Sequence, residues 1–218
     1  MSEETDAKMK VMRERFERDL PGEIERMNKA EAEYHTALGK FIETFATVES
    51  GLFAYLQRAA HMSDTTARIV ASGWRTGNMI TFVQSVWKAE PPPPEDAFLQ
   101  DAVGQLTHIN NLRNSLIHYA SAFEFADPDE PRLSSNAGRH VPSKPATEFR
   151  VSATMLTDCT SDLQVIYIRF LNYQTRESLS LEDRAGYSIM NPDYAWLCKP
   201  NASPPAKSPK PKSRHRKK

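Results

Sequence analysis

The amino-acid sequence predicts an all-α protein, an up-and-down bundle of about four or five helices. Apolar residues recur at helical spacing along several long stretches, and short segments rich in proline, glycine or serine separate those stretches. Only eight of the 218 residues are glycine, and dense runs of β-branched residues are few. This composition argues against a β-sandwich or a β-barrel.

The N-terminal region is expected to form two helices separated by a Pro-Gly pair. Residues 3–19 are charged and helix-prone, and Pro21 and Gly22 are expected to interrupt the chain before a longer helix over about 24–60. One apolar stripe at helical spacing marks the core face of the longer helix: Leu38, Phe41, Ile42, Phe45, Val48, Leu52, Phe53 and Leu56. Glu49 falls inside this stripe, so its carboxylate is expected to be at least partly buried and to need a partner.

Two further core helices are expected in the middle of the chain. One spans about 65–89, with Ser63 and Asp64 as capping residues and the four prolines 91–94 as its stop signal. The next runs from about residue 95 to 123. Its predicted core face comprises Leu99, Ala102, Leu106, Ile109, Leu116, Ile117, Ala120 and Phe123.

The C-terminal part of the bundle is expected to contain one more helix. A loop rich in Pro, Ser, Asp and Gly covers residues 126–147, and a short extended piece follows at 148–151. Ser152 or Thr154 is expected to cap the last helix, which covers about 154–177.

The chain therefore divides into three parts. Residues 1–23 form a charged helical extension, and residues 24–198 form the helical domain, with a loop over 124–150. Residues 199–218 form a tail that is expected to be disordered from its composition. The tail holds eight Lys or Arg and no acidic residue, which leaves 20 basic against 28 acidic residues in the rest of the chain. A net charge of zero thus combines an acidic body with a basic tail.

Several classes of protein lack support in the sequence. No stretch approaches the roughly 20 apolar residues of a membrane-spanning helix, and the start MSEETDAKMK lacks the apolar core of a signal peptide. Cys159 and Cys198 have neither CxxC nor zinc spacing, so we expect two reduced thiols in a cytoplasmic protein. The histidines show no ligand spacing, and no metal or cofactor is expected. The motifs GxSxG, Walker A, GxGxxG and HExxH are absent from the sequence.

Arg113 is the most unusual residue of the predicted core faces. It lies near the centre of the core face of the helix over 95–123. A guanidinium keeps its charge at every accessible pH, so a buried arginine needs a carboxylate or several other acceptors. We therefore expect a contact between Glu49 and Arg113, with Arg75 as a competing cation.

A second polar face begins in the same segment, NNLRNSLIHYAS. Asn111, Asn114 and His118 follow one another at i, i+3 and i+7. His118 lies about 140° around a straight helix from Arg113, so the two side chains are expected to diverge. This polar face is expected to meet solvent, a ligand or a second copy of the protein.

Arg113 and Asn114, followed by Leu116, Ile117 and His118, resemble the signature of HEPN domains. These are all-helical modules of toxin–antitoxin, abortive-infection and RNA-processing systems. Their motif is an Arg, four to six residues and a His, often with an Asn after the Arg. The helix order and the acidic residue on an upstream apolar face are also similar, and the resemblance covers about residues 30–177.

The resemblance implies a HEPN-like bundle and metal-independent RNA cleavage that leaves a 2′,3′-cyclic phosphate. His118 would move protons near neutral pH, and Arg113 would stabilise the charge on the phosphorus centre. Asn114 would orient the phosphate or the histidine. The other residues expected to bind or orient substrate are Asn111, Glu49, Arg75 and Tyr119. A homodimer would bring the His of one chain to a site shared with the Arg of the other.

The resemblance implies RNA as substrate and an antitoxin or another protein as a partner, in a toxin or defence role. Some family members carry a Tyr two residues after the His, where this chain has Ala120 and places Tyr119 next to the His. Two alternatives remain open. The domain can be a non-catalytic binding or scaffold module in which Arg113 is a structural ion-pair residue, or the basic tail can make the chain a nucleic-acid-binding adaptor.

Overall fold

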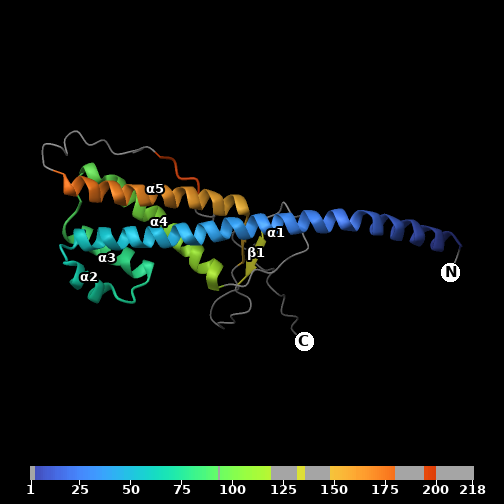
Figure 1. The fold of residues 1–218 in the computed structure, drawn as a ribbon, viewed down its shortest axis with the longest axis horizontal. Coiled ribbons are helices and arrows are strands. Elements are labelled where there is room, and N and C mark those ends of the chain that lie inside the picture. The colour runs from blue at the N-terminus through green and yellow to red at the C-terminus, as the bar shows by residue number, and fades with distance from the viewer. Residues whose placement is uncertain (1–2, 93, 119–131, 136–147, 180–193, 200–218) are drawn as a thin grey trace, which may run out of the picture.

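The computed structural model describes residues 3–92, 94–118, 132–135, 148–179 and 194–199. Within these ranges the protein is a helical bundle, as predicted, with one short pair of strands beside it (Figure 1). The elements are α1 (Glu3–Ala59), α2 (Asp64–Ala71), α3 (Thr76–Ala89), a 3-10 turn (Pro94–Asp96), α4 (Ala97–His118), β1 (Arg132–Ser135), β2 (Glu148–Val151) and α5 (Ala153–Ser178).

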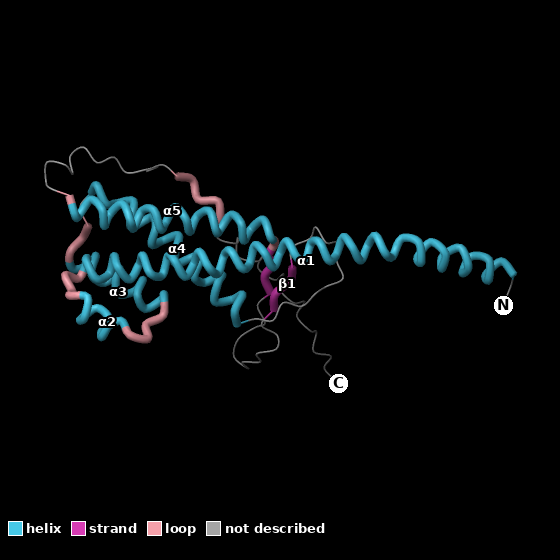
Figure 2. Tube along the Cα trace, viewed as in Figure 1, coloured by secondary structure: helices cyan, strands magenta, loops and turns pink. Residues whose placement is uncertain are grey.

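The helix α1 is continuous through Pro21, so the predicted interruption at Pro21 and Gly22 is wrong. A proline inside a helix lacks one backbone donor and strains the turn before it, at a cost of about 3 kcal/mol. The surrounding Glu, Arg, Lys and Met residues favour helix strongly enough for the backbone to continue on both sides. As a result, the N-terminal half of α1 projects well beyond the other helices (Figures 1 and 2).

The single helix predicted over 65–89 is also wrong, because the chain breaks into α2 and α3. Gly73 adopts a φ of +76° at the break, a conformation that glycine accepts at little cost. The predicted start is confirmed, since the Ser63 hydroxyl accepts a hydrogen bond from the backbone N–H of Thr66 at 3.2 Å. The break lets α3 begin at Thr76 and bury one face against α1.

The centre of the bundle is the contact between α1 and α5, which run side by side in the same direction (Figure 1). A Cβ added to Gly51 would lie 3.1 Å from the ring of Tyr167, so the missing side chain permits a close approach of the two helices. Near the end of the contact, Arg58 donates to the backbone carbonyl of Gln174 at 2.8 Å. The predicted α1 stripe forms this core: Phe41, Phe45, Val48, Leu52 and Leu56 are buried, and Leu38, Ile42 and Phe53 pack against them.

The helix α4 runs opposite to α5. The first four residues of its predicted core face, Leu99, Ala102, Leu106 and Ile109, are fully buried. Ile117, however, is 50% exposed, so its assignment to the core is wrong. An ion pair between Arg176 and Asp96, with 2.5 Å between Nη2 and Oδ2, joins the start of α4 to the end of α5. Ala120 and Phe123 lie outside the described residues.

The strands β1 and β2 pair in antiparallel fashion just before α5, with Arg132 opposite Val151. The predicted extended piece at 148–151 is confirmed as β2, whereas β1 lies in the stretch predicted as loop. Ser152 caps α5, as expected, by accepting a hydrogen bond from the backbone N–H of Met155 at 3.0 Å.

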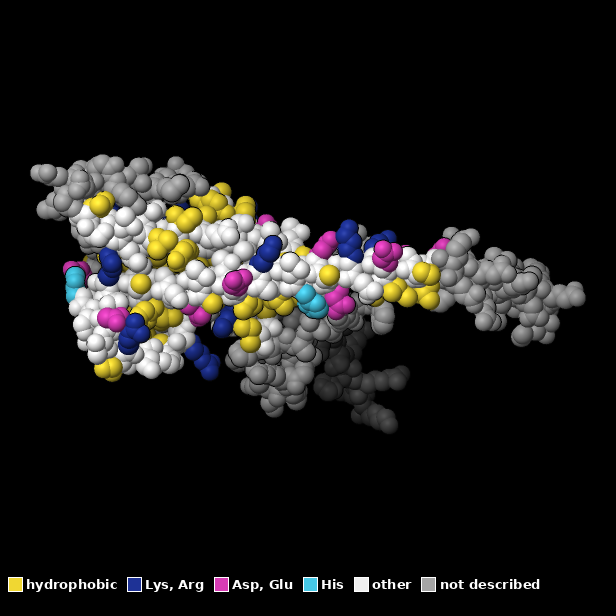
Figure 3. Space-filling view, in the orientation of Figure 1, with side chains coloured by type: hydrophobic (Ala, Val, Ile, Leu, Met, Phe, Trp, Pro, Cys, Tyr) yellow, Lys and Arg dark blue, Asp and Glu magenta, His cyan; other side chains and the backbone are white. Residues whose placement is uncertain are grey.

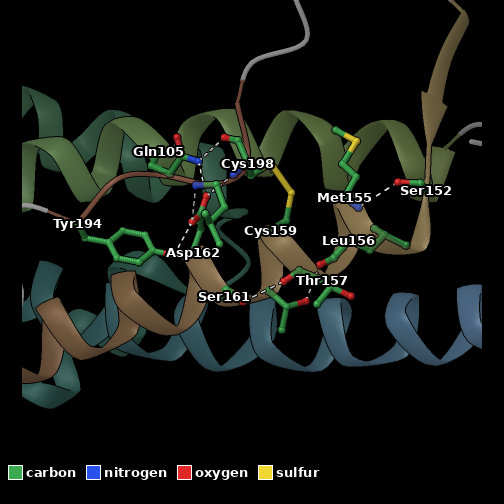
Figure 4. Close-up of a disulfide and its surroundings, with 12 residues drawn as sticks. Gln105, Ser152, Met155, Leu156, Thr157, Cys159, Ser161, Asp162, Tyr194 and Cys198 are labelled. Carbon is green, nitrogen blue, oxygen red and sulfur yellow. Dashed lines mark hydrogen bonds between the residues drawn. A yellow bond between two sulfur atoms is a disulfide. The ribbon is translucent and has the colours of Figure 1, made fainter.

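The predicted pair of reduced thiols is wrong, because Cys159 and Cys198 form a disulfide with their Cα atoms 5.0 Å apart. Cys159 lies on α5 and Cys198 lies in an extended C-terminal segment, residues 194–199, that runs along α4 and α5 (Figure 4). The two cysteines are 39 residues apart, so their pairing depends on the fold and has no local sequence signature. In the described part of the chain, no helix is long and apolar enough to cross a membrane.

Candidate functional site

The candidate site is the last part of α4, where the segment from Asn111 to His118 closes the helix. Arg113 is half-buried there, and its guanidinium carbon lies 5.2 Å from the centre of the Phe45 ring on α1. Its Nη1 donates to the side-chain oxygen of Asn114 at 3.2 Å. The contact with the aromatic ring and the hydrogen bond to the amide orient the planar guanidinium.

The expected contact between Glu49 and Arg113 is wrong as an ion pair. The Glu49 carboxylate accepts a hydrogen bond from the hydroxyl of Thr76, a residue that is only 2% exposed. Thr76 is the first residue of α3, where the helix dipole favours negative charge, and the N-cap residue Arg75 makes no capping hydrogen bond of its own. The N-terminus of α3 therefore satisfies Glu49, which explains how a carboxylate fits within an apolar stripe.

Arg113 differs from Arg169 and Arg176, which also stack on aromatic rings in the described part of the bundle. Arg169 lies over Trp196 and pairs with Asp101 at 2.9 Å, and Arg176 lies over Tyr173 and pairs with Asp96 at 2.5 Å. Arg113, by contrast, forms no ion pair within 4.0 Å with any carboxylate that the structure describes. Its positive charge therefore has no negative partner among the described side chains.

A buried amide one turn before Arg113 completes the polar part of this region. Asn110 is 6% exposed, and its side-chain nitrogen lies 3.7 Å from where a Cβ on Gly77 would be. It therefore lies at the contact between α4 and α3. The sequence did contain a signal for it, because Asn110 lies about 40° from the buried Leu106 on the helix projection.

The remaining predicted residues are only partly brought together. Asn111 and Arg75 are exposed, and Arg75 pairs with no carboxylate among the described residues, so it does not act as the predicted competitor for Glu49. His118 is the last residue of α4, but its side chain lies outside the described part of the structure, as does the whole of Tyr119. The joint placement of Arg113 and His118 therefore stays a prediction.

The chemistry available at this site is anion binding. A guanidinium presents donors in a rigid fork that fits the oxygens of a phosphate or carboxylate, and the adjacent amide adds both a donor and an acceptor. The face of the protein shown in Figure 3 has basic and acidic side chains interspersed along the projecting part of α1, not gathered by sign. Among the described residues, no group of three His, Cys, Asp or Glu side chains is arranged to hold a metal ion.

No protein-family model, no curated protein and no solved structure matches this chain.

Proposed function

We propose that the chain is a HEPN-like, metal-independent endoribonuclease of the cytoplasm that acts as a homodimer through the end of α4. Arg113 binds the scissile phosphate and stabilises its developing negative charge. His118 transfers protons between the 2′-hydroxyl, the phosphate and the leaving 5′-oxygen. Asn114 holds the guanidinium in position, as its hydrogen bond to Nη1 supports.

The observation that carries this proposal is that no carboxylate in the described part of the chain pairs with Arg113. Arg169 and Arg176 each pair with a carboxylate, Arg113 pairs with none that the structure describes, and Glu49 accepts a hydrogen bond from Thr76. A buried or half-buried arginine without an anion is costly unless a ligand supplies one. RNA phosphate supplies that anion, and the basic tail adds electrostatic attraction that the acidic body lacks.

Two copies are required because Arg113 and His118 diverge by about 140° on one helix. In a homodimer, the His118 of one chain serves the site that contains the Arg113 of the other. A toxin or defence role, with an antitoxin or other protein that controls the nuclease, belongs to the same proposal. It rests on the resemblance of the Arg113–His118 motif to HEPN domains.

A second candidate function is a non-catalytic binding module, and one observation favours it. The Nε atom of Arg113 is buried without a hydrogen-bond partner in the described structure, and the guanidinium stacks on the core residue Phe45. Part of the arginine therefore serves the packing between α1 and α4. In this alternative, the site binds an anionic group of a partner and performs no reaction.

The test is cleavage of a fluorescent RNA by the full-length protein in the presence of EDTA. His118→Ala is expected to reduce the rate by roughly 10²- to 10⁴-fold, and Arg113→Lys by at least about tenfold, because an ammonium lacks the bidentate fork. His35→Ala and Arg68→Lys, at exposed positions, are the matched controls and should cleave like the wild type. The products should carry 2′,3′-cyclic phosphate and 5′-hydroxyl ends.

Mixing the Arg113→Lys and His118→Ala proteins, both impaired alone, tests the shared site. A heterodimer of Arg113→Lys and His118→Ala chains keeps one intact site, so random mixing should restore about a quarter of wild-type activity. Absence of any rescue would place both residues of one site on the same chain. A folded wild-type protein that binds RNA and never cleaves it would favour the binding module, and full activity of His118→Ala would reject the nuclease mechanism.

A further inference from the structure

One buried carboxylate holds the C-terminal segment Tyr194–Lys199, which we call the strap. Asp162 on α5 is fully buried and accepts four hydrogen bonds. Three come from the strap: the Tyr194 hydroxyl at 3.0 Å, the backbone N–H of Leu197 at 3.0 Å and that of Cys198 at 2.8 Å. The fourth comes from the Gln105 side chain of α4 at 2.8 Å (Figure 4).

A second polar contact holds the middle of the strap. The indole N–H of Trp196 donates to both oxygens of the Asp101 carboxylate, at 2.9 and 3.0 Å. The guanidinium of Arg169 lies 4.8 Å from the centre of the Trp196 ring and pairs with the same carboxylate. The strap is thus recognised by charged groups of both α4 and α5.

The strap is partly exposed, and Trp196 and Cys198 are its contacts with the apolar core. Ala195, Leu197 and Lys199 are exposed, Leu197 by 49%, and only Cys198 is buried. When the strap lifts, Asp162 loses donors but gains access to water, so no charge is left buried and unpaired. Hydrogen bonds to Asp162 and Asp101 thus supply most of the described contacts of the strap with α4 and α5.

The disulfide between Cys159 and Cys198 joins the strap covalently to α5. Cys159 is fully buried and Cys198 is 2% exposed, while the carbonyl of Cys198 accepts a hydrogen bond from Gln105 at 2.6 Å. A reductant must reach a sulfur atom along the line of the S–S bond, so attack requires the strap to open first. The contacts of Asp162 therefore control access to the disulfide.

We propose that the strap is a redox-controlled latch: Asp162 captures the strap and aligns Cys198 with Cys159, and the disulfide then locks it. In the unlocking step, one thiolate of a dithiol reductant attacks a sulfur of the disulfide and forms a mixed disulfide, and the other cysteine leaves as a thiolate. The second thiol of the reductant then displaces the first cysteine. Two electrons and two protons pass to the cysteines, and the reductant ends as a disulfide.

The latch has a consequence for the basic tail. The tail begins at Lys199, directly after Cys198, so in the locked state its eight basic residues are joined to the bundle at the α4–α5 face. Once the disulfide is reduced and the strap is released, Lys199 and the tail lose this attachment to α5. A disulfide is uncommon in a reducing compartment and is usually transient there, which suits a sensor better than a permanent staple. The latch does not depend on the proposed nuclease activity.

The test measures reduction of the full-length protein after oxidation with glutathione disulfide. Dithiothreitol is added, free thiols are alkylated at intervals, and the fraction of linked Cys159–Cys198 is read by mass spectrometry. Asp162→Asn replaces an acceptor with a donor beside the strap amides, and we expect reduction at least about tenfold faster, equivalent to about 1.4 kcal/mol of easier opening. Asp158→Asn, one turn earlier on α5, makes none of the strap hydrogen bonds above and should be reduced at the wild-type rate.

A milder variant keeps the test decisive if Asp162→Asn does not fold. Tyr194→Phe removes one strap hydrogen bond and leaves Asp162 in place, so reduction should accelerate by roughly three- to tenfold. In the reduced wild type, hydrogen exchange at the amides of Leu197 and Cys198 should become at least about tenfold faster while α1 is unchanged. Equal reduction rates in all variants, unchanged exchange after reduction, or two freely alkylated cysteines after oxidation would each overturn the latch.

Discussion

The stacking of Arg113 on Phe45 predicts a measurable coupling between the two residues. The guanidinium lies 5.2 Å from the ring centre, within the range of a cation–π interaction, and Phe45 is 1% exposed. Such interactions contribute about 0.5–1 kcal/mol at exposed sites and about 2 kcal/mol when desolvated. Arg113 is half-buried, so we expect a coupling free energy of about 1 kcal/mol.

Single substitutions cannot isolate this coupling, because each one also changes the packing. Phe45→Leu leaves a space in the core at a cost of roughly 1–3 kcal/mol. Arg113→Met keeps most of the side-chain volume and removes the charge. A double-mutant cycle with both changes cancels these separate costs and leaves the interaction between the two side chains.

The assay is urea unfolding of the four proteins at one pH and ionic strength. With a slope of about 2 kcal/mol per molar urea, a coupling of about 1 kcal/mol corresponds to about 0.5 M urea. The shift in unfolding midpoint of the double mutant should differ by this amount from the sum of the shifts of the two single mutants. Phe41→Leu, one turn away on the same face of α1 and also buried, is the matched control and should be additive with Arg113→Met. A coupling below about 0.3 kcal/mol at Phe45, or an equal coupling at Phe41, would refute the idea that the ring positions the guanidinium.

Two further predictions concern other parts of the bundle. Gly51→Ala should lower the free energy of unfolding by about 1–3 kcal/mol, because the new Cβ would meet the Tyr167 ring at 3.1 Å. Gly39→Ala in the same helix, where a Cβ meets nothing within 4 Å, should raise the free energy of unfolding by up to about 1 kcal/mol. Urea unfolding measures both changes. Burial and its hydrogen bond to Asp162 raise the pKa of Tyr194 from 10.0 to about 12. The hydroxyl of Tyr194 loses its proton near pH 10 in the released strap but keeps it in the docked strap. Docking of the strap is therefore complete below pH 10 and weakens as the pH rises towards 12. Hydrogen exchange at the strap should show this weakening in the wild type and not in Tyr194→Phe.

Much of the fold follows from periodicity and capping alone. Several features lie where the sequence predicts them: the α1 stripe, the first half of α4, the caps Ser63 and Ser152, and the extended piece before α5. These features depend on neighbours within a few residues, which the sequence contains. The errors at Pro21 and Gly73 have one origin: a breaking residue shows that a helix can stop, but the surrounding propensity and packing decide whether it does.

The site was less accessible to sequence reasoning because helix projection identifies a face and not the neighbour opposite it. The projection correctly assigned Glu49 and Arg113 to inward positions. It could not show that the N-terminus of α3 would reach Glu49 first, since the break that creates that N-terminus was itself not predicted. Asp162 and the strap gave no signal at all, because their contact joins α5 to a segment more than 30 residues later in the chain.

The arginines of this bundle show how the protein distributes negative charge. Asp101 serves both Arg169 and the indole of Trp196, so one carboxylate holds a helix and the strap together. Asp162 likewise accepts four hydrogen bonds, one from α4 and three from the strap. Arg113 is half-buried and, among the described residues, has no carboxylate partner; departures of this kind concentrate at binding sites. If Arg113 were only structural, a neutral residue of equal volume would pack as well and avoid the desolvation cost. Arg113→Met should therefore reduce the free energy of RNA binding by more than it reduces the free energy of unfolding. A larger loss in unfolding than in binding would identify Arg113 as a packing residue.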